Sequence, residues 1–127
     1  MYYIVETSKT PEQAAADLAE AVTRNGFSVL HVHDLGAALR GKGIAFERQC
    51  KVFEVCNPRQ AASVLAADMR LNMALPCRIS VYTDAGKTWI GMIRPVPMLG
   101  MLSTDPALVA TAGEVEQVVT RIIAEAR

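Results

Sequence analysis

The sequence predicts a single α+β domain, in which helices cover one face of a sheet that takes its strands from the whole chain. Two observations lead to this prediction. Short segments rich in β-branched and aromatic residues recur along the 127 residues, as in strands, and segments between them space apolar residues by three and four, as in helices with one buried side. This length, with 51% apolar residues, suffices for one buried core but not for two.

The first strand and the first helix are expected within residues 2–26. Residues 2–7 have the β-branched and aromatic composition of a strand. Thr10-Pro11-Glu12-Gln13 is a helix start, because Thr10 can cap, Pro11 suits the first helical position and Gln13 can complete a capping box. Apolar residues then follow at helical spacing and Asn25-Gly26 ends the helix; the expected buried stripe is Ala15, Leu18, Ala19 and Val22.

The middle of the chain predicts two strands and a second capped helix. Residues 27–33 and 49–56 are strand segments, with a short helical or looped stretch over residues 34–43 between them. The second strand runs directly into a helix start, residues 57–60, with Asn57 as the cap. The spacing of the apolar residues after this start predicts a buried stripe of Ala62, Leu65, Ala66 and Met69.

The last third predicts a hairpin and a closing helix. Residues 77–83 and 87–94 are strands joined by Asp84-Ala85-Gly86, and Gly86 suits the positive φ of a three-residue loop with a bulge. Two prolines and a glycine interrupt the pattern over residues 95–100, and Asp105-Pro106 can start a helical turn. The apolar stripe of the closing amphipathic helix is Val115, Val118, Val119 and Ile122.

Composition argues against two classes of partner. Thirteen basic residues balance thirteen acidic ones, so no net field attracts nucleic acid or an anionic membrane. No apolar run approaches the length that spans a bilayer, and the N-terminus lacks the pattern of a secretory signal. Three cysteines are too few, and odd in number, for a disulfide scaffold. We therefore expect a cytoplasmic domain that binds neither nucleic acid nor membrane.

The strand over residues 27–33 carries apolar side chains on both of its faces. Phe27 and Val29 alternate with Leu30 and Val32, so helices on one side of the sheet would leave apolar groups uncovered on the other. A small domain rarely leaves such a patch in contact with water. The sequence therefore predicts a homodimer.

Two short motifs resemble the domain of unknown function 302 family. They are the run VFEVCNP over residues 52–58 and the run LPCRI over residues 75–79. The resemblance covers residues 1–95, and residues 96–127 are an extension with an amphipathic helix that we assign to the same domain. The resemblance implies an α+β fold with a curved, mostly antiparallel sheet, helices on one face and a dimeric assembly. It implies no particular reaction.

Cys56, Cys77 and Arg78 are the candidate ligand-binding residues. Cys56 directly precedes a helix cap, and the positive end of a helix dipole favours a thiolate. A thiolate could ligate a soft metal, coordinate haem iron or attack an electrophile. The alternative is that both cysteines are small apolar residues of the core. Arg78 lies beside Cys77 and could line a pocket for an anion together with Glu47, Arg48 and Arg94, although surface ion pairs explain these charges equally well.

His31 and His33 are the candidate metal ligands. Residues two apart in a strand point to the same face, so both imidazoles could hold one metal ion. The alternative is that they are half-exposed strand histidines with hydrogen bonds to neighbours or water. A metal or haem is thus a possible cofactor, provided that the histidines and the two cysteines converge in space.

These observations favour a homodimeric domain that binds a small ligand, a metal ion or haem. One alternative is an enzyme or redox protein that uses Cys56 as its reactive thiol. Another is an interaction module without chemistry, which docks a partner through its sheet face or its last helix, the latter with Val118 and Ile122. No Ser-His-Asp arrangement or nucleophile elbow is present, so the sequence leaves open whether the protein is an enzyme.

Overall fold

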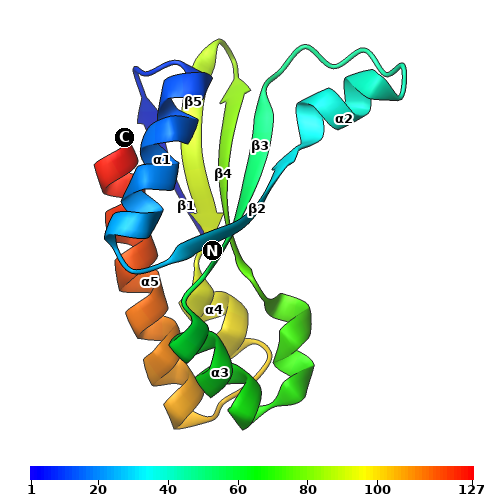
Figure 1. The fold of residues 1–127 in the computed structure, drawn as a ribbon. Coiled ribbons are helices and arrows are strands. Elements are labelled where there is room, and N and C mark those ends of the chain that lie inside the picture. The colour runs from blue at the N-terminus through cyan, green and yellow to red at the C-terminus, as the bar shows by residue number, and fades with distance from the viewer.

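The computed structural model describes residues 1–127 as one α+β domain built on a five-stranded sheet (Figure 1). The strand order is β1-β5-β4-β3-β2, and every neighbouring pair is antiparallel. The strands are β1 (Tyr2–Thr7), β2 (Ser28–Asp34), β3 (Cys50–Cys56), β4 (Cys77–Asp84) and β5 (Lys87–Ile93). The predicted fold class and strand segments are confirmed.

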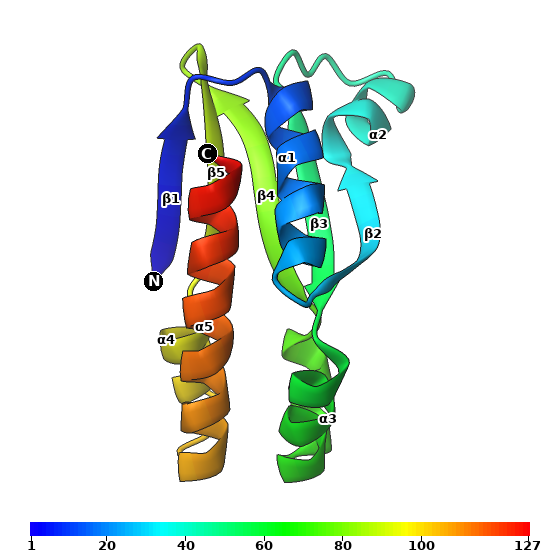
Figure 2. The same ribbon diagram turned by 60° about the vertical axis from the view of Figure 1, so that its left-hand side comes forward.

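The helices form two groups. Helices α1 (Pro11–Arg24) and α5 (Pro106–Ala126) lie side by side on one face of the sheet (Figure 2). Beyond one end of the sheet, α3 (Pro58–Ala67), the 3-10 helix η1 (Met69–Ala74) and α4 (Pro95–Gly100) pack with the first half of α5. We call this second group the lower lobe. Helix α2 (Leu35–Gly41) and the loop that follows it extend away from the rest of the domain (Figure 1).

Helices α1, α3 and α5 begin as the sequence dictates. Each has a proline in its first turn, and the side-chain oxygens of Thr10, Asn57 and Asp105 each accept a backbone N–H of that turn. These bonds satisfy donors that a helix N-terminus otherwise leaves unpaired. The capping predicted at Thr10 and Asn57 is therefore confirmed.

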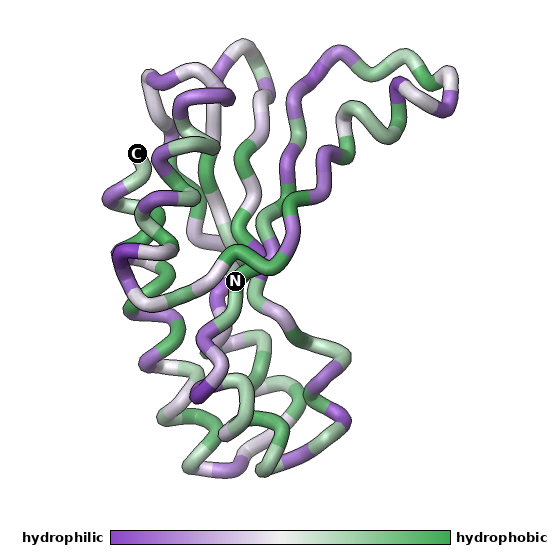
Figure 3. Tube along the Cα trace, viewed as in Figure 1, coloured by the Kyte–Doolittle hydropathy of each residue, from purple (hydrophilic) through white to green (hydrophobic).

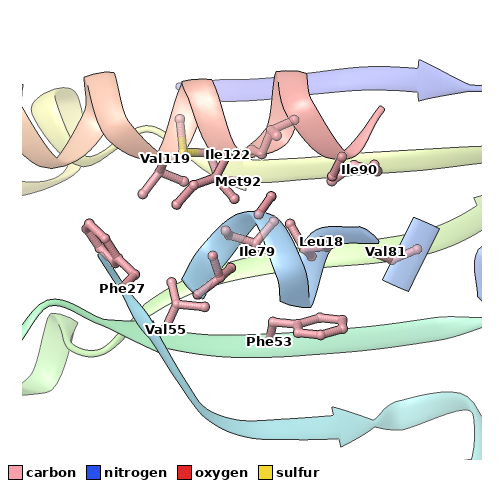
Figure 4. Packing of buried hydrophobic residues seen from close by; sticks show 14 of the residues in the cluster. Leu18, Phe27, Phe53, Val55, Ile79, Val81, Ile90, Met92, Val119 and Ile122 are labelled. Carbon is pink, nitrogen blue, oxygen red and sulfur yellow. The ribbon is translucent and has the colours of Figure 1, made fainter. Parts of the chain in front are cut away.

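Two groups of buried apolar residues hold the layers together. The larger lies between the sheet and helices α1 and α5, and Figure 4 draws 14 of its members, among them Leu18, Phe53 and Ile79. The smaller lies in the lower lobe. Helix α5 contributes Leu108 to the smaller group and Ile122, fully buried, to the larger. Ile122 thus belongs to the protein's own core, which excludes it as an exposed docking residue.

Two local predictions are wrong. In α3 the buried residue is Val64, whereas Ala62 and Ala66 are exposed and Met69, 65% exposed, lies outside the helix. The alanine-rich helix has faces of similar hydropathy, so tertiary packing decided which one is buried. The β4–β5 loop has two residues instead of three, because Ala85 adopts a positive φ of 52° together with Gly86.

The other face of the sheet has no helix on it. Side chains that alternate with the buried ones point to this open face, and one row across the five strands consists of Ile4, Gly91, Ser80, Val52 and His33. Hydrophobic and hydrophilic residues both occur along each of these strands (Figure 3). None of the helices combines the length and the hydropathy that a membrane-spanning helix requires.

Candidate functional site

Cys56 and Cys77 converge at the end of the sheet that adjoins the lower lobe. Strands β3 and β4 are antiparallel, and Cys77 pairs with Val55, the residue before Cys56. Helix α3 and η1 carry the chain out into the lower lobe and back again between the two cysteines. Both partly buried side chains line the same cavity, of about 160 Å³. We call it the inner cavity.

The inner cavity is almost entirely apolar. It lies between the ends of β3 and β4 and helices α3, α4 and α5. Among its eighteen lining residues are Phe27, Val64, Leu99 and Val115, which also belong to the two buried groups. Three polar residues also line it, namely Asn57, Gln60 and Thr111, and among them Gln60 has a buried Oε1 without a hydrogen-bond partner. A buried acceptor without a donor is costly, so a hydrogen-bond donor that reached this oxygen would be stabilising.

The environment of Cys77 keeps its thiol protonated. Burial, and to a smaller extent the neighbouring Cys56, raise the pKa of Cys77 to about 11. At neutral pH this sulfur is therefore a thiol that packs as an apolar group. Such a group neither attacks an electrophile readily nor ligates a metal without first losing its proton.

A second hollow, the outer groove, of about 360 Å³, lies on the open face beside the first. It is lined by fifteen residues from β1, β3, β4, β5, α5 and the lower lobe, and Arg78 is the charged one among them. The predicted anion pocket of Glu47, Arg48, Arg78 and Arg94 does not form. Arg48 Nε lies 3.6 Å from Asp84 Oδ1, and Arg94 Nη2 lies 3.1 Å from Glu116 Oε2. The inner cavity and the outer groove share a wall of five residues: Ala74, Pro76, Cys77, Pro95 and Met98.

His31 and His33 lie on the open face and line neither of the two hollows. They pair across to Glu54 and Val52 of β3, and their ring centroids are 4.4 Å apart in an edge-on arrangement. His33 Nε2 contacts Glu54 Oε1, and this hydrogen bond holds the pKa of the Glu54 carboxyl below its usual value. The two histidines share a face as expected, but no group of three or more His, Cys, Asp or Glu side chains lies in position to hold a metal ion.

Sequence reasoning missed several residues that line the two hollows. Gln60 was recognised as part of a helix start, and its buried oxygen depends on how α3 packs against the lower lobe. Tyr2, Ser80 and Tyr82 have no motif around them and meet on the open face because of the strand register. The alternation of side chains along the strands at 77–83 and 2–7 was the one available signal for this shared face.

Comparison with known proteins places the chain in a family. The model of the Domain of unknown function DUF302 matches residues 3–126. The chain belongs to the DUF302 family. The match extends through α5, beyond residue 95, where the resemblance in the sequence ended.

A solved structure agrees with this membership. The crystal structure of an uncharacterized conserved DUF302 protein from Bacillus stearothermophilus is similar to this DUF302 chain, with 33% sequence identity and a TM-score of 0.93. The alignment covers 99% of this chain and 98% of that one. No curated protein matches the sequence.

Proposed function

We propose that this DUF302 protein binds a small, mostly apolar molecule in the inner cavity. The observation that supports the proposal is the convergence of Cys56 and Cys77 on one apolar hollow of about 160 Å³. Hollows in well-packed interiors cost stability, and the surrounding residues regain contacts when a ligand fills them. An engineered apolar cavity of about 150 Å³ binds benzene, so a single-ring molecule matches the inner cavity in size.

Gln60 specifies the polar part of the ligand. Its Oε1 is buried without a partner beside an apolar space. A ligand with an apolar body and one hydrogen-bond donor satisfies that oxygen, whereas a pure hydrocarbon leaves it unpaired. We infer that a hydroxyl- or amine-bearing ring compound binds more tightly than its hydrocarbon analogue.

Other readings of the thiol pair fit less well. Haem is far larger than a single-ring molecule, and drug-sized ligands already need roughly 300 Å³ or more, so the inner cavity of about 160 Å³ does not accommodate it. The raised pKa of Cys77 disfavours this thiol as a nucleophile or metal ligand. Cys56 remains the candidate if the protein is a thiol-dependent enzyme, and its alkylation rate in Cys50→Ser protein tests that alternative.

Titration with phenol and toluene, followed by NMR chemical-shift changes, tests the proposal. We expect both to shift resonances of α3 and α5, with phenol binding more tightly. Ala61 lines the cavity and Ala62 of the same helix is exposed, so Ala61→Leu should abolish binding and Ala62→Leu should not. Gln60→Leu should remove the preference for phenol. Binding that is unchanged in Ala61→Leu would refute the assignment of the cavity.

We further propose that the protein is a homodimer that associates through β2 and the α2 segment. Strand β2 is an edge of the sheet, where Leu30 is 58% and Val32 38% exposed. Leu35 (44%) and Ile44 (51%) continue this apolar surface along the projecting segment. An edge strand with exposed apolar side chains favours pairing with another chain. Sedimentation velocity should give a dimer that Leu30→Lys dissociates; a monomeric parent protein would exclude it.

A further inference from the structure

The outer groove has a floor that a single glycine keeps open. Gly91 lies between Ile4 of β1 and Ser80 of β4 in the row across the open face. A Cβ at position 91 would come within 2.9 Å of Ile4 Cγ1 and 3.1 Å of Tyr3 O. The backbone of β5 therefore approaches β1 more closely than a side chain would permit, and the hollow above it stays free.

The polar side chains of the outer groove form no hydrogen bond or salt bridge within the protein. Arg78 is exposed and lies within salt-bridge distance of no carboxylate; Glu54, opposite it in the β3–β4 register, contacts His33, and its pKa is lowered mainly by His33 and to a smaller extent by Arg78. Ser80 and Tyr82, which line the same hollow, form no side-chain hydrogen bond. Burial and the nearby Asp84 raise the pKa of the Tyr82 phenol, so it keeps its proton and can donate.

Apolar residues surround these polar groups. Ten of the fifteen lining residues are hydrophobic, including Tyr2 (71% exposed), Ile4 (44%) and Ile93 (49%). Arg78 supplies the charge of the groove, and no acidic side chain lines it. A hollow of about 360 Å³ falls in the size range of small-molecule sites, which typically combine an apolar surface with a few polar groups that orient the ligand.

We propose that the outer groove binds an amphipathic organic anion, with its carboxylate on Arg78 and its apolar chain along Tyr2, Ile4 and Ile93. The guanidinium presents N–H donors in a plane that matches both oxygens of a carboxylate. Ser80, two residues further along β4, adds a neutral donor next to Arg78, and Tyr82 lies two residues beyond Ser80 on the same strand. This ligand is separate from the one in the inner cavity, because the wall that contains Cys77 and Met98 lies between the two hollows.

A second copy of the chain is a poorer occupant of this groove. The groove has no acidic side chain to receive the Arg78 of a second copy, and Glu54, which lies beside Arg78 outside the groove, is already in contact with His33. The apolar surface at β2 and α2 lies at the opposite edge of the sheet from β1. The groove and the proposed dimer interface therefore do not compete.

Calorimetric titration of the protein with decanoate and with decanol tests the assignment. We expect decanoate to bind about tenfold more tightly than decanol, because a hydrogen-bonded charge pair is worth roughly that factor. Arg78→Gln should remove this advantage and leave decanol binding unchanged. Arg48→Gln removes the same charge elsewhere on the surface and should leave both affinities as they are.

Two further variants separate this site from the inner cavity. Ser80→Leu fills the floor of the outer groove, so we expect it to weaken decanoate and decanol together, with the fold checked by circular dichroism. Ala61→Leu should leave decanoate binding intact even where it abolishes phenol binding. Equal affinities of the parent protein for decanoate and decanol, equal effects of Arg78→Gln and Arg48→Gln, or loss of decanoate binding in Ala61→Leu would each overturn the proposal.

Discussion

Gly91 and Ile4 lie opposite each other in the β1–β5 register, and a Cβ on the glycine would approach Ile4 Cγ1 to 2.9 Å. Gly91→Ala therefore requires β1 and β5 to move apart, since the backbone carbonyl oxygen of Tyr3 would also lie only 3.1 Å from the new atom. We expect a loss of about 1–3 kcal/mol in the free energy of unfolding, as in other overpacked sites. Urea denaturation measures this loss.

Gly113 provides the matched control for that substitution. It lies within α5, and no atom lies within 4 Å of the position that a Cβ would occupy. Because alanine is a better helix former than glycine, Gly113→Ala should raise the stability by up to about 1 kcal/mol. A similar loss in both variants would contradict the role given to the close approach of β5 to β1.

The buried thiol of Cys77 makes stability depend on pH in alkali. Its pKa is about 11 in the folded protein against 9.0 for an unperturbed thiol. The folded state holds the proton more tightly, so this contribution is complete below about pH 9 and is lost as the pH rises toward 11. Since one pKa unit is worth about 1.4 kcal/mol, the loss is on the order of 2–3 kcal/mol.

Comparison of the parent protein with Cys77→Ala isolates this effect. The variant has no thiol to ionise at that position, so the stability difference between the two proteins should shrink between pH 9 and pH 11, the range that the two pKa values define. Urea midpoints at several pH values measure it. A difference that stays constant over this range would show that the Cys77 thiol is open to water.

Asn57 joins the strand that ends in Cys56 to helix α3. Its Oδ1 accepts the backbone N–H groups of Arg59 and Gln60. Asn57→Ala removes both bonds and should cost about 1 kcal/mol, whereas Asn57→Asp keeps an acceptor at the same place and should cost little. Because the cap also positions Gln60, we expect the alanine variant to bind phenol more weakly. Equal stabilities of the two variants would contradict the capping role.

Ile122 anchors the second half of α5 to the sheet. Its side chain is fully buried among the residues shown in Figure 4, whereas Val109 near the start of the same helix is 47% exposed. We expect Ile122→Ala to destabilise the protein by about 2–5 kcal/mol, as for other large core residues, and Val109→Ala to have little effect. Thermal unfolding of both variants measures the contrast. A small effect at Ile122 would indicate that α5 is loosely packed.

Local signals in the sequence were sufficient for most of the secondary structure. The caps at Thr10 and Asn57 depend on residues within one helical turn, and strand composition depends on immediate neighbours, so both could be recognised without knowledge of the fold. The length of the β4–β5 loop could not be predicted in this way. Ala85 adopts a positive φ that is unusual for alanine, and the tight two-residue turn therefore had no sequence signature.

The candidate site depended on contacts that no local pattern contains. Whether Cys56 and Cys77 meet is decided by the antiparallel pairing of β3 with β4, and that pairing forms because α3 and η1 return the chain to the sheet. The residues between them include no strong turn motif. The sequence singled out Arg78 beside Cys77. That Arg78, Ser80 and Tyr82 lie together on the open face follows from the pairing of β4 with β3 and β5.

Helix α5 runs without interruption from the lower lobe to the far end of the sheet (Figure 2). Leu108 and Ala112 pack in the lower lobe, while Val119 and Ile122 pack against the sheet. If the lower lobe unfolded, the first half of α5 would lose its packing, and if the sheet unfolded, the second half would lose it. In either case the shared helix would be destabilised. The whole chain should therefore unfold in one cooperative transition. The most slowly exchanging amide hydrogens of the sheet and of the lower lobe should exchange through the same global unfolding.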